Sequence, residues 1–182
     1  FIMHVTTGGN AGMLQSITGS EQDSLYFWHH FFQPTEEELK SLPEAYGLHP
    51  LAIEDCMDDD QIPKMESFAK NTHLIFNTFS YEQQKIQSEE VNIFIGENFV
   101  ITVTRSKRLS DAIFGVTEKM LHSNNGHWRT GPSWLMHTIL DKIIDEKMKS
   151  LEILEDETDA IEDGVLAGTS TLDFAQIQRL RY

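Results

Sequence analysis

The chain contains a single cysteine, Cys56, among its 182 residues. It therefore cannot form an internal disulfide, and this low cysteine content is typical of proteins in a reducing compartment. Basic residues are also scarce, since 14 Lys and Arg stand against 29 Asp and Glu, for a formal net charge of -15. Because binding to phosphate backbones depends on basic surface, this balance argues against a nucleic-acid partner and favours hard cations or a basic protein.

Long apolar runs are missing as well. No stretch approaches the roughly 18 apolar residues that a transmembrane helix requires, and the uncharged stretch 73–81 is far too short. The first residues lack the basic region followed by an apolar region that marks a secretory signal. We therefore expect any connection to a membrane to lie outside these residues.

Three motifs of hydrolases and nucleotide-binding enzymes are absent: G-x-S-x-G, the P-loop and H-E-x-x-H. The chain has 8 histidines and many carboxylates, but no spacing pairs them as in a metallohydrolase. We therefore expect no enzymatic activity.

The segment 49–64, which reads HPLAIEDCMDDDQIPK, concentrates negative charge. His49 and Pro50 predict a helix start, because proline fits the first helical position, where its missing N–H would be unpaired anyway. Five carboxylates follow within seven residues: Glu54, Asp55, Asp58, Asp59 and Asp60. Acidic side chains near the C-terminal end of a helix oppose its dipole. The pattern fits either a solvated, poorly formed last turn or a site for a cation.

Strand patterns dominate the first hundred residues. We expect strands at 1–5, 13–17, 26–32, 73–81, 91–95 and 99–104, with the first two and the last two joined as hairpins. The adjacent His29 and His30 should point to opposite faces of a strand. We therefore expect one packed and one solvated histidine rather than a shared metal site.

Helix signals are fewer but clear. Thr35 and Glu38 have the spacing of a capping box, which predicts a short helix that stops at Gly47. An amphipathic pattern predicts a second helix at 109–121. The region 133–166 has an apolar stripe of helical period. At 1.5 Å per residue, about thirty residues of it make a rod of roughly 45 Å, so we expect it to project.

The second half of that rod is strongly acidic. No basic residue follows Lys149 within it, and it carries seven carboxylates: Glu152, Glu155, Asp156, Glu157, Asp159, Glu162 and Asp163. A solvated face is the ordinary interpretation. The alternative is a cation or a basic neighbour that relieves the repulsion between like charges. After a break at 164–169 we expect a further helix at 172–182, which stops without a cap and so indicates a truncated chain.

Several segments together match one known family. HPLAIED at 49–55 is followed eight residues later by Pro63-Lys64, and Pro34-Thr35-Glu36-Glu37 precedes it. The strand pair 89–104, the helix 135–145 and the acidic stretch 154–166 extend the match over nearly the whole chain. As a set, these segments resemble the cytosolic domain of CorA-type magnesium transporters.

Two departures from the family pattern stand beside the acidic residues. The chain has Gln61-Ile62-Pro63-Lys64 where the family commonly has Gln-Arg-Pro-Lys, so one cation is lost. The run Asp58–Asp60 is more acidic than usual, and we assign it no role.

The resemblance implies an α/β fold, a three-layer α/β/α sandwich with a mixed sheet. A long projecting acidic helix and the start of an antiparallel helical hairpin would follow. We expect an α/β domain at 1–131 and a truncated acidic helical hairpin at 132–182. The membrane part of the family is expected to be absent, because its Gly-Met-Asn sequence does not occur here.

The resemblance also implies a function. The chain would be the regulatory domain of a magnesium ion transporter of the cell membrane, on the cytoplasmic side. With its own membrane domain it would form a homopentamer, whereas this fragment would be a monomer or weak oligomer. Glu54, Asp55 and Asp141 would be regulatory ligands between subunits for Mg2+, or for Co2+, Ni2+ or Zn2+.

Two alternatives remain open at this point. The first is a zinc- or cobalt-transporting member of the same superfamily, which the eight histidines allow. The second, from a different class, is a stand-alone acidic protein-interaction module that uses the long helix as its partner surface.

Overall fold

A computed structural model describes residues 2–8, 12–18, 26–42, 44–58, 61–122 and 131–167. The predicted helix at 172–182, most of the loop at 122–131, and Asp59 and Asp60 lie outside these residues. Among the residues that are described, no helix combines the length and apolar character needed to cross a membrane.

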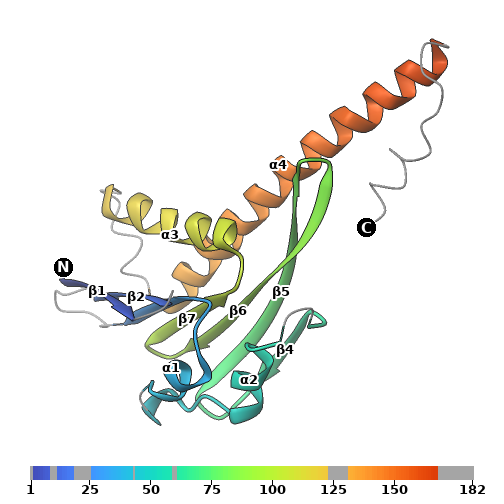
Figure 1. Ribbon diagram of the computed structural model, residues 1–182. Helices are drawn as coiled ribbons and strands as arrows, with labels where there is room; N and C mark the ends of the chain where they lie inside the picture. Colours follow the sequence, from blue (N-terminus) through green and yellow to red (C-terminus); the bar gives the residue numbers. More distant parts are fainter. Residues whose placement is uncertain are drawn as a thin grey trace.

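Seven strands form one mixed sheet, drawn in Figure 1. They are β1 (Ile2–Gly8), β2 (Gly12–Thr18), β3 (Phe27–Phe32), β4 (Lys64–Ser67), β5 (Asn71–Glu82), β6 (Lys85–Gly96) and β7 (Phe99–Thr104). Their spatial order is β1-β2-β3-β7-β6-β5-β4. Only β3 and β7 are parallel neighbours, and every other adjacent pair is antiparallel.

Helices cover both faces of this sheet (Figure 1). The helices are α1 (Glu36–Lys40), a single 3-10 turn at Glu44–Tyr46, α2 (Pro50–Asp55), α3 (Lys107–His122) and α4 (Pro132–Leu166). The short helices α1 and α2 pack on one face, and α3 with the first half of α4 packs on the other. This is the predicted three-layer α/β/α sandwich with a mixed sheet and a long projecting helix.

Each face of the sheet has its own hydrophobic core. The α3–α4 side includes Trp28, Val91, Ile93, Val100, Leu109, Ile113, Leu135, Ile139 and Ile143. The α1–α2 side includes Phe31, Leu39, Tyr46, Ala52, Ile53, Cys56, Phe94, Phe99, Ile101 and Val103. Strand β7 is buried at all six positions because it lies between both helical layers.

The predicted hairpin turn between β6 and β7 is confirmed. It uses Gly96, where an added Cβ would lie 2.1 Å from Cε1 of Phe99. This close approach of the ring to the backbone leaves room only for glycine. Strand β6 itself begins at Lys85, six residues before the expected Val91, because its polar first half pairs only with β5.

One predicted helix boundary was wrong. The helix after Thr35 has its capping box, but it ends at Lys40 rather than near residue 45. Pro43 explains this, since proline lacks the N–H that a continuing helix needs and restricts the residue before it. The long helix agrees with its prediction, because α4 spans Pro132–Leu166 and the expected region was 133–166; the predicted break therefore begins after Gly164 and not at it.

His29 and His30 lie on opposite faces of β3, as predicted. His30 is buried, with Nδ1 2.8 Å from Oγ1 of Thr102 and Nε2 2.9 Å from Oγ of Ser110. His29 is half-buried rather than solvated, and its Nε2 lies 2.9 Å from the Tyr46 hydroxyl. Burial lowers the pKa of each histidine to about 4.

The buried His30 predicts a loss of stability in mild acid. Burial lowers its pKa to about 4, with the charge of Asp111 only partly offsetting the effect. The unfolded chain takes up a proton near pH 6.5, so the free energy of unfolding should fall between about pH 6.5 and 4, by about 1–3 kcal/mol from this group.

Urea unfolding at pH 7 and pH 4.5 measures this effect. The His30→Gln variant should lose less stability over that interval than the wild type, because glutamine does not take up a proton. The matched control is His137→Gln, at an exposed position of α4, which should keep the wild-type pH dependence. Equal losses in the wild type and His30→Gln would contradict the prediction.

Candidate metal centre

Helix α2 positions the acidic residues that the sequence singled out. Nδ1 of His49 accepts a hydrogen bond from the backbone N–H of Leu51 (3.2 Å), and Pro50 opens the first turn. Ala52 and Ile53 are buried against the sheet and fix the helix orientation. The helix ends at Asp55, so the carboxylates begin in its last turn, as predicted.

Glu54 and Asp55 have different surroundings at this helix end. Glu54 is exposed, whereas Asp55 is half-buried. Nζ of Lys64, the first residue of β4, lies 2.9 Å from Oδ2 of Asp55 and 3.4 Å from Oε2 of Glu66. The hydrogen bond to Asp55 raises the pKa of Lys64. A protein cation therefore already stands between two carboxylates at this place.

His73 completes a cluster with these carboxylates. It pairs with Glu66 in the register of β4 and β5, and it is fully buried. One ligand atom from each of Asp55, Glu66 and His73 lies within 4.8 Å of the others. Burial lowers the pKa of His73, which favours its neutral imidazole form. Carboxylate oxygens with a neutral imidazole make a donor set for a metal ion.

The structure does not bring Asp141 to this cluster. Asp141 is exposed on α4, which packs on the opposite face of the sheet from α2. The three residues predicted as cation ligands thus occupy two different layers of one chain. Asp58 is also exposed, and its Oδ2 lies 3.5 Å from Nε2 of Gln61.

The sequence interpretation missed Glu66 and His73 as possible ligands. The signal was weak, because the strand that carries Glu66, Lys64–Ser67, is short and polar, and only its pairing with β5 places Glu66 opposite His73. The sequence pattern places His73 at the start of a strand, but its partner across the hairpin depends on the register, which the pattern leaves open.

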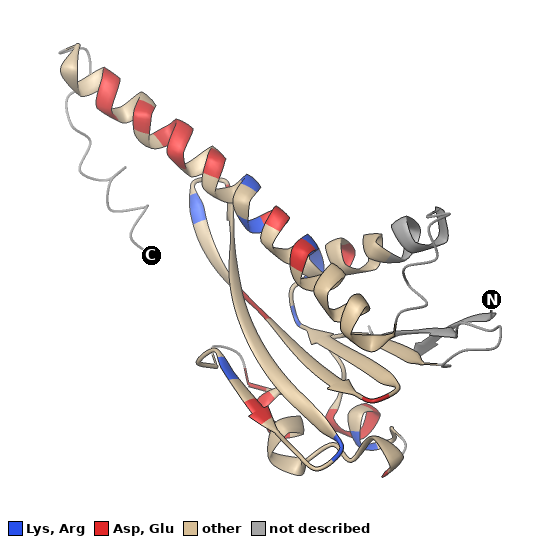
Figure 2. Ribbon diagram, turned by 180° about the vertical axis from the view of Figure 1, so that it is seen from behind, with Lys and Arg blue, Asp and Glu red and all other residues tan. Residues whose placement is uncertain are grey.

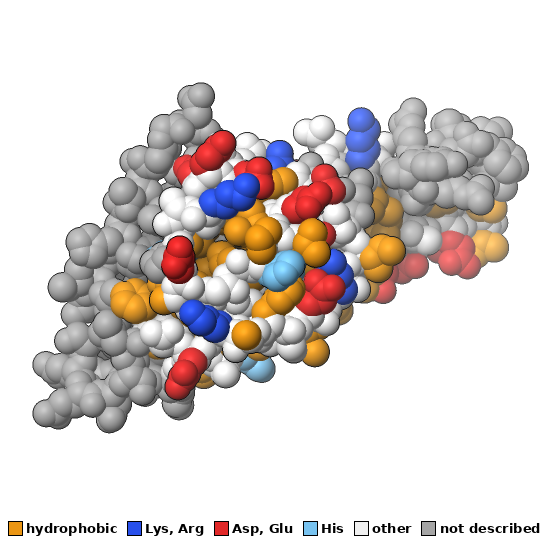
Figure 3. All heavy atoms as spheres, turned by 90° about the horizontal axis from the view of Figure 1, so that it is seen from below, with side chains coloured by type: hydrophobic (Ala, Val, Ile, Leu, Met, Phe, Trp, Pro, Cys, Tyr) orange, Lys and Arg blue, Asp and Glu red, His pale blue; other side chains and the backbone are white. Residues whose placement is uncertain are grey.

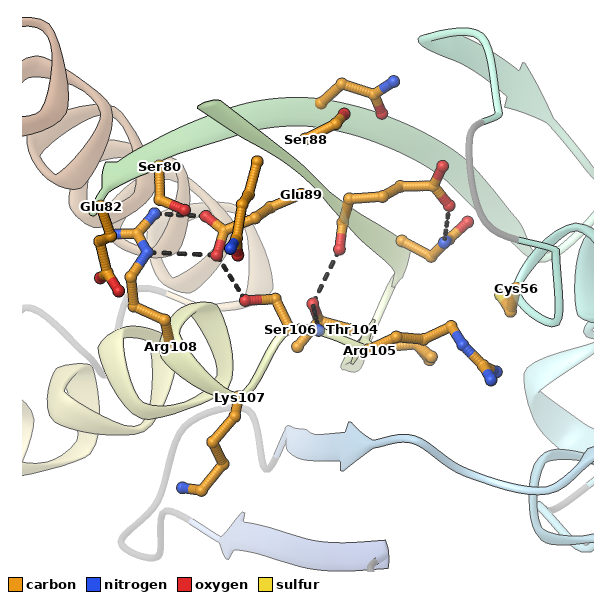
Figure 4. Close-up of a pocket in the computed structure, with 15 residues that line it drawn as sticks. Cys56, Ser80, Glu82, Ser88, Glu89, Thr104, Arg105, Ser106, Lys107 and Arg108 are labelled. Atoms are coloured by element: carbon orange, nitrogen blue, oxygen red, sulfur yellow. Dashed lines mark hydrogen bonds and ion pairs between the residues drawn. The ribbon is translucent and has the colours of Figure 1, made fainter. Parts of the chain in front are cut away.

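A separate pocket of about 470 Å³ lies at the C-terminal end of β7 (Figure 4). The parallel strands β3 and β7 lead into helices on opposite faces of the sheet, an arrangement at which open α/β sheets often bind ligands. Here Arg108 is held by Glu89 and, at 3.5 Å, by Glu146. The side chain of Lys107 extends away from the other labelled residues (Figure 4), and its ammonium pairs with Asp111 on the same helix. The ion pairs of Arg108 tie α3 to β6 and α4.

The outer half of α4 is acidic, as predicted (Figure 2). Its carboxylates are exposed, apart from the half-buried Glu157. Glu157 accepts a hydrogen bond from the Tyr81 hydroxyl at the tip of the β5–β6 hairpin. Lys147 lies over the ring of Phe79, 5.6 Å from its centroid, on the same hairpin. The ordinary interpretation, a largely solvated face, describes most of this region.

The lower end of the molecule, which carries α1 and α2, is chemically mixed. Figure 3 shows hydrophobic side chains there among charges of both signs. Three large apolar side chains near the cluster are strongly exposed: Leu51 at 62%, Ile62 at 81% and Met65 at 70%. Ile62 stands where the resembled family commonly has an arginine.

Comparison with known proteins gives a consistent result. A sequence model described as "CorA-like Mg2+ transporter protein" matches residues 23–181. The chain is 29% identical over 143 residues to YfjQ of Bacillus subtilis, covering 79% of this chain and 43% of that protein. It is 26% identical over 130 residues to the cobalt/magnesium transport protein CorA of Thermotoga maritima, covering 70% of this chain and 36% of that protein.

A solved structure agrees with the sequence matches. The soluble domain of CorA from Methanocaldococcus jannaschii superposes with a TM-score of 0.70 at 25% identity, covering 86% of this chain and 62% of that one. The chain spans less than half the length of the two curated relatives above.

Proposed function

The chain belongs to the CorA-like Mg2+ transporter family, and on that premise we propose that it is the cytosolic regulatory domain of a magnesium ion transporter. In this proposal it senses divalent cations through acidic sites between subunits, at the cytoplasmic side of the cell membrane. Residues 1–131 would form the sensor body, with the inner half of α4 packed against them, and 132–182 would begin the acidic hairpin that leads toward the membrane part.

One observation carries the proposal: the placement of the predicted ligands in separate layers. Glu54 is exposed and Asp55 half-buried at the end of α2, while Asp141 is exposed on α4 across the sheet. Such residues can share a cation only when two copies meet. Mg2+ keeps several of its waters and needs only one or two carboxylates per protein surface. The geometry therefore supports a hydrated cation held between subunits.

The regulatory step follows from electrostatics. A cation between two acidic edges cancels their repulsion and favours the assembly that holds it, whereas its loss lets the edges separate. Lys64 already neutralises part of the charge on Asp55, so the incoming cation must compete with an ammonium. This competition favours weak binding, in the millimolar range suited to sparse, water-rich sites.

The exposed apolar side chains beside the cluster support a contact between copies. Leu51, Ile62 and Met65 are each more than half exposed, and apolar groups gathered in this way often mark an interaction surface. In the full-length protein we propose a homopentamer, as the family resemblance implies, and in this fragment a monomer or weak oligomer.

Limited proteolysis of the full-length parent protein tests the proposal. Raising Mg2+ should protect the wild type, and Asp55→Ala should shift the protective concentration upward by several-fold. The control is Asp111→Ala, which removes one exposed carboxylate from α3 and should leave the Mg2+ dependence unchanged. Equal protection curves for Asp55→Ala and the wild type would count against the assignment.

Two other functions stay open to the same protein. Uptake assays with competing Mg2+, Zn2+ and Co2+ separate a magnesium transporter from a zinc- or cobalt-transporting relative. A stand-alone acidic interaction module would require a parent gene without apolar membrane spans downstream of Tyr182.

A further inference from the structure

We propose that Asp55, Glu66 and His73 form a transition-metal site within a single subunit, suited to Zn2+ or Co2+. The imidazole of His73 would supply a nitrogen ligand and the two carboxylates oxygen ligands. The site is complete in one chain, so it goes beyond the cation site proposed between subunits and does not depend on it. Of the three ligands, only Asp55 belongs to both.

The strongest support is the unused nitrogen of His73. The residue is fully buried, and among the described residues Nδ1 has no hydrogen-bond partner. A buried polar atom without a partner is destabilising, because it has lost its hydrogen bonds to water, and a fold seldom leaves such an atom unpaired. A metal ion at Nδ1 would satisfy it, and nearby carboxylates are the ligands that such an ion would share.

The surrounding hydrogen bonds set the tautomer that a metal requires. Nδ2 of Asn92 donates to Oε1 of Glu90 (2.8 Å), which turns the amide oxygen of Asn92 toward His73. That oxygen lies 2.8 Å from Nε2 of His73, so Nε2 carries the proton and Nδ1 keeps its lone pair. Metal-binding histidines commonly donate their second ring N–H to such an oxygen.

Packing fixes the ring in the same orientation. The imidazole stacks on Phe94 with centroids 4.3 Å apart and an interplanar angle of 7°. A preoriented ring loses little freedom on binding a metal. The nitrogen donor is thus held by a hydrogen bond on one side and an aromatic face on another.

The two carboxylates leave the site open to solvent and can move toward an incoming ion. The ligand atoms lie within 4.8 Å of one another, while metal–ligand bonds of about 2.0–2.2 Å bring them to about 4.4 Å or less. The side chain of Glu66 is 46% exposed and can make such a small movement, and that of Asp55 is 20% exposed. The site therefore opens to solvent on the carboxylate side.

Lys64 stands in this site as a built-in competitor. Its ammonium bridges Asp55 and Glu66, which accounts for both carboxylates but not for the unpaired Nδ1 of His73. A divalent ion that displaces Lys64 gains the same two carboxylates and the nitrogen. An imidazole ligand favours Zn2+, Co2+ or Ni2+, whereas Mg2+ prefers oxygen ligands throughout.

Isothermal titration calorimetry of the chain with ZnCl2, CoCl2 and MgCl2 tests the site. The wild type should bind Zn2+ at least tenfold more tightly than Mg2+. His73→Phe should weaken Zn2+ binding about tenfold or more and leave Mg2+ binding unchanged. Lys64→Met should strengthen Zn2+ binding several-fold, because it removes the competing ammonium without removing a ligand.

Controls keep the result decisive. His137→Gln removes an exposed histidine from α4 and should leave the Zn2+ affinity unchanged. Should His73→Phe fail to fold by circular dichroism, Glu66→Gln replaces it, since it alters an exposed ligand and should also weaken Zn2+ binding. The visible spectrum of bound Co2+ should change in Glu66→Gln and His73→Phe.

A Zn2+ affinity equal to that of the wild type in both Glu66→Gln and His73→Phe would overturn the proposal. Neither residue belongs to the ligand set proposed between subunits. Failure here therefore leaves the Mg2+ proteolysis experiment untouched, and an unchanged Asp55→Ala proteolysis curve would not remove a zinc site shown by calorimetry.

Discussion

Replacing Ile139 by alanine should lower the free energy of unfolding by about 2–5 kcal/mol, whereas the same change at Ile153 should cost less than about 0.5 kcal/mol. Both residues lie on α4, but Ile139 is fully buried and Ile153 is 49% exposed. Ile139 packs in the core beneath the sheet together with Leu135 and Ile143. The matched pair thus separates the effect of burial from that of helix propensity.

Urea unfolding followed by tryptophan fluorescence measures both variants. Trp28 and Trp134 lie in or against the same core, so the signal reports loss of this packing. Equal costs at the two positions would mean that the outer half of α4 is packed as firmly as the inner half. The expected difference would also mean that a chain shortened at Pro132 loses part of its core, because the inner half of α4 completes the sandwich.

The second large effect is expected at the ion pair beside the pocket. Arg108→Met should lower the free energy of unfolding by about 3–5 kcal/mol, since breaking a buried pair leaves an uncompensated charge. The Glu89 side chain is only 6% exposed, and the side-chain contact that it keeps among the described residues when Arg108 is removed is with the hydroxyl of Ser106. Arg108 also reaches Glu146 on α4.

Two further variants make this prediction specific. Lys107→Met removes the adjacent cation, whose pair with Asp111 has side chains more than 60% exposed, and such a surface pair contributes only about 0–1 kcal/mol. The double variant Arg108→Met with Glu89→Met should recover much of the loss, because no buried charge remains. A double variant no more stable than Arg108→Met would contradict this explanation.

The layered fold was accessible from the sequence because its cores are made of local patterns. The alternating strands, the stripe of α4 and the proline-led start of α2 each depend on residues close together in the chain. The polar first half of β6 was not accessible in this way. Gln87, Ser88 and Glu89 carry no apolar alternation, and they form a strand only because β5 pairs with them.

The residues of the candidate site divide in the same way, into those that a local sequence pattern indicates and those that only the fold brings together. Glu54 and Asp55 stand in a recognisable segment, so the sequence indicated them directly. His73 and Glu66 are brought together by strand register, and the unpaired Nδ1 arises from hydrogen bonds through Asn92 and Glu90. This network joins the three strands β4, β5 and β6 and leaves no trace in the spacing of residues along the chain.

Helix α4 is held at its inner end and near its middle, and its outer end extends beyond these contacts. Its inner end is held in the core as far as Ile143, further contacts follow at Glu146 and Lys147, and the outermost of these contacts is Glu157, which the Tyr81 hydroxyl contacts at the tip of the β5–β6 hairpin. At 1.5 Å per residue, Glu157 lies about 21 Å and Leu166 about 34 Å from Ile143 along the helix. If α4 turns as a rigid rod about Ile143, a displacement of about 1 Å at Glu157 moves Leu166 by about 1.6 Å. The β5–β6 hairpin therefore sets the direction of α4, and a small movement of the hairpin tip produces a larger movement at Leu166.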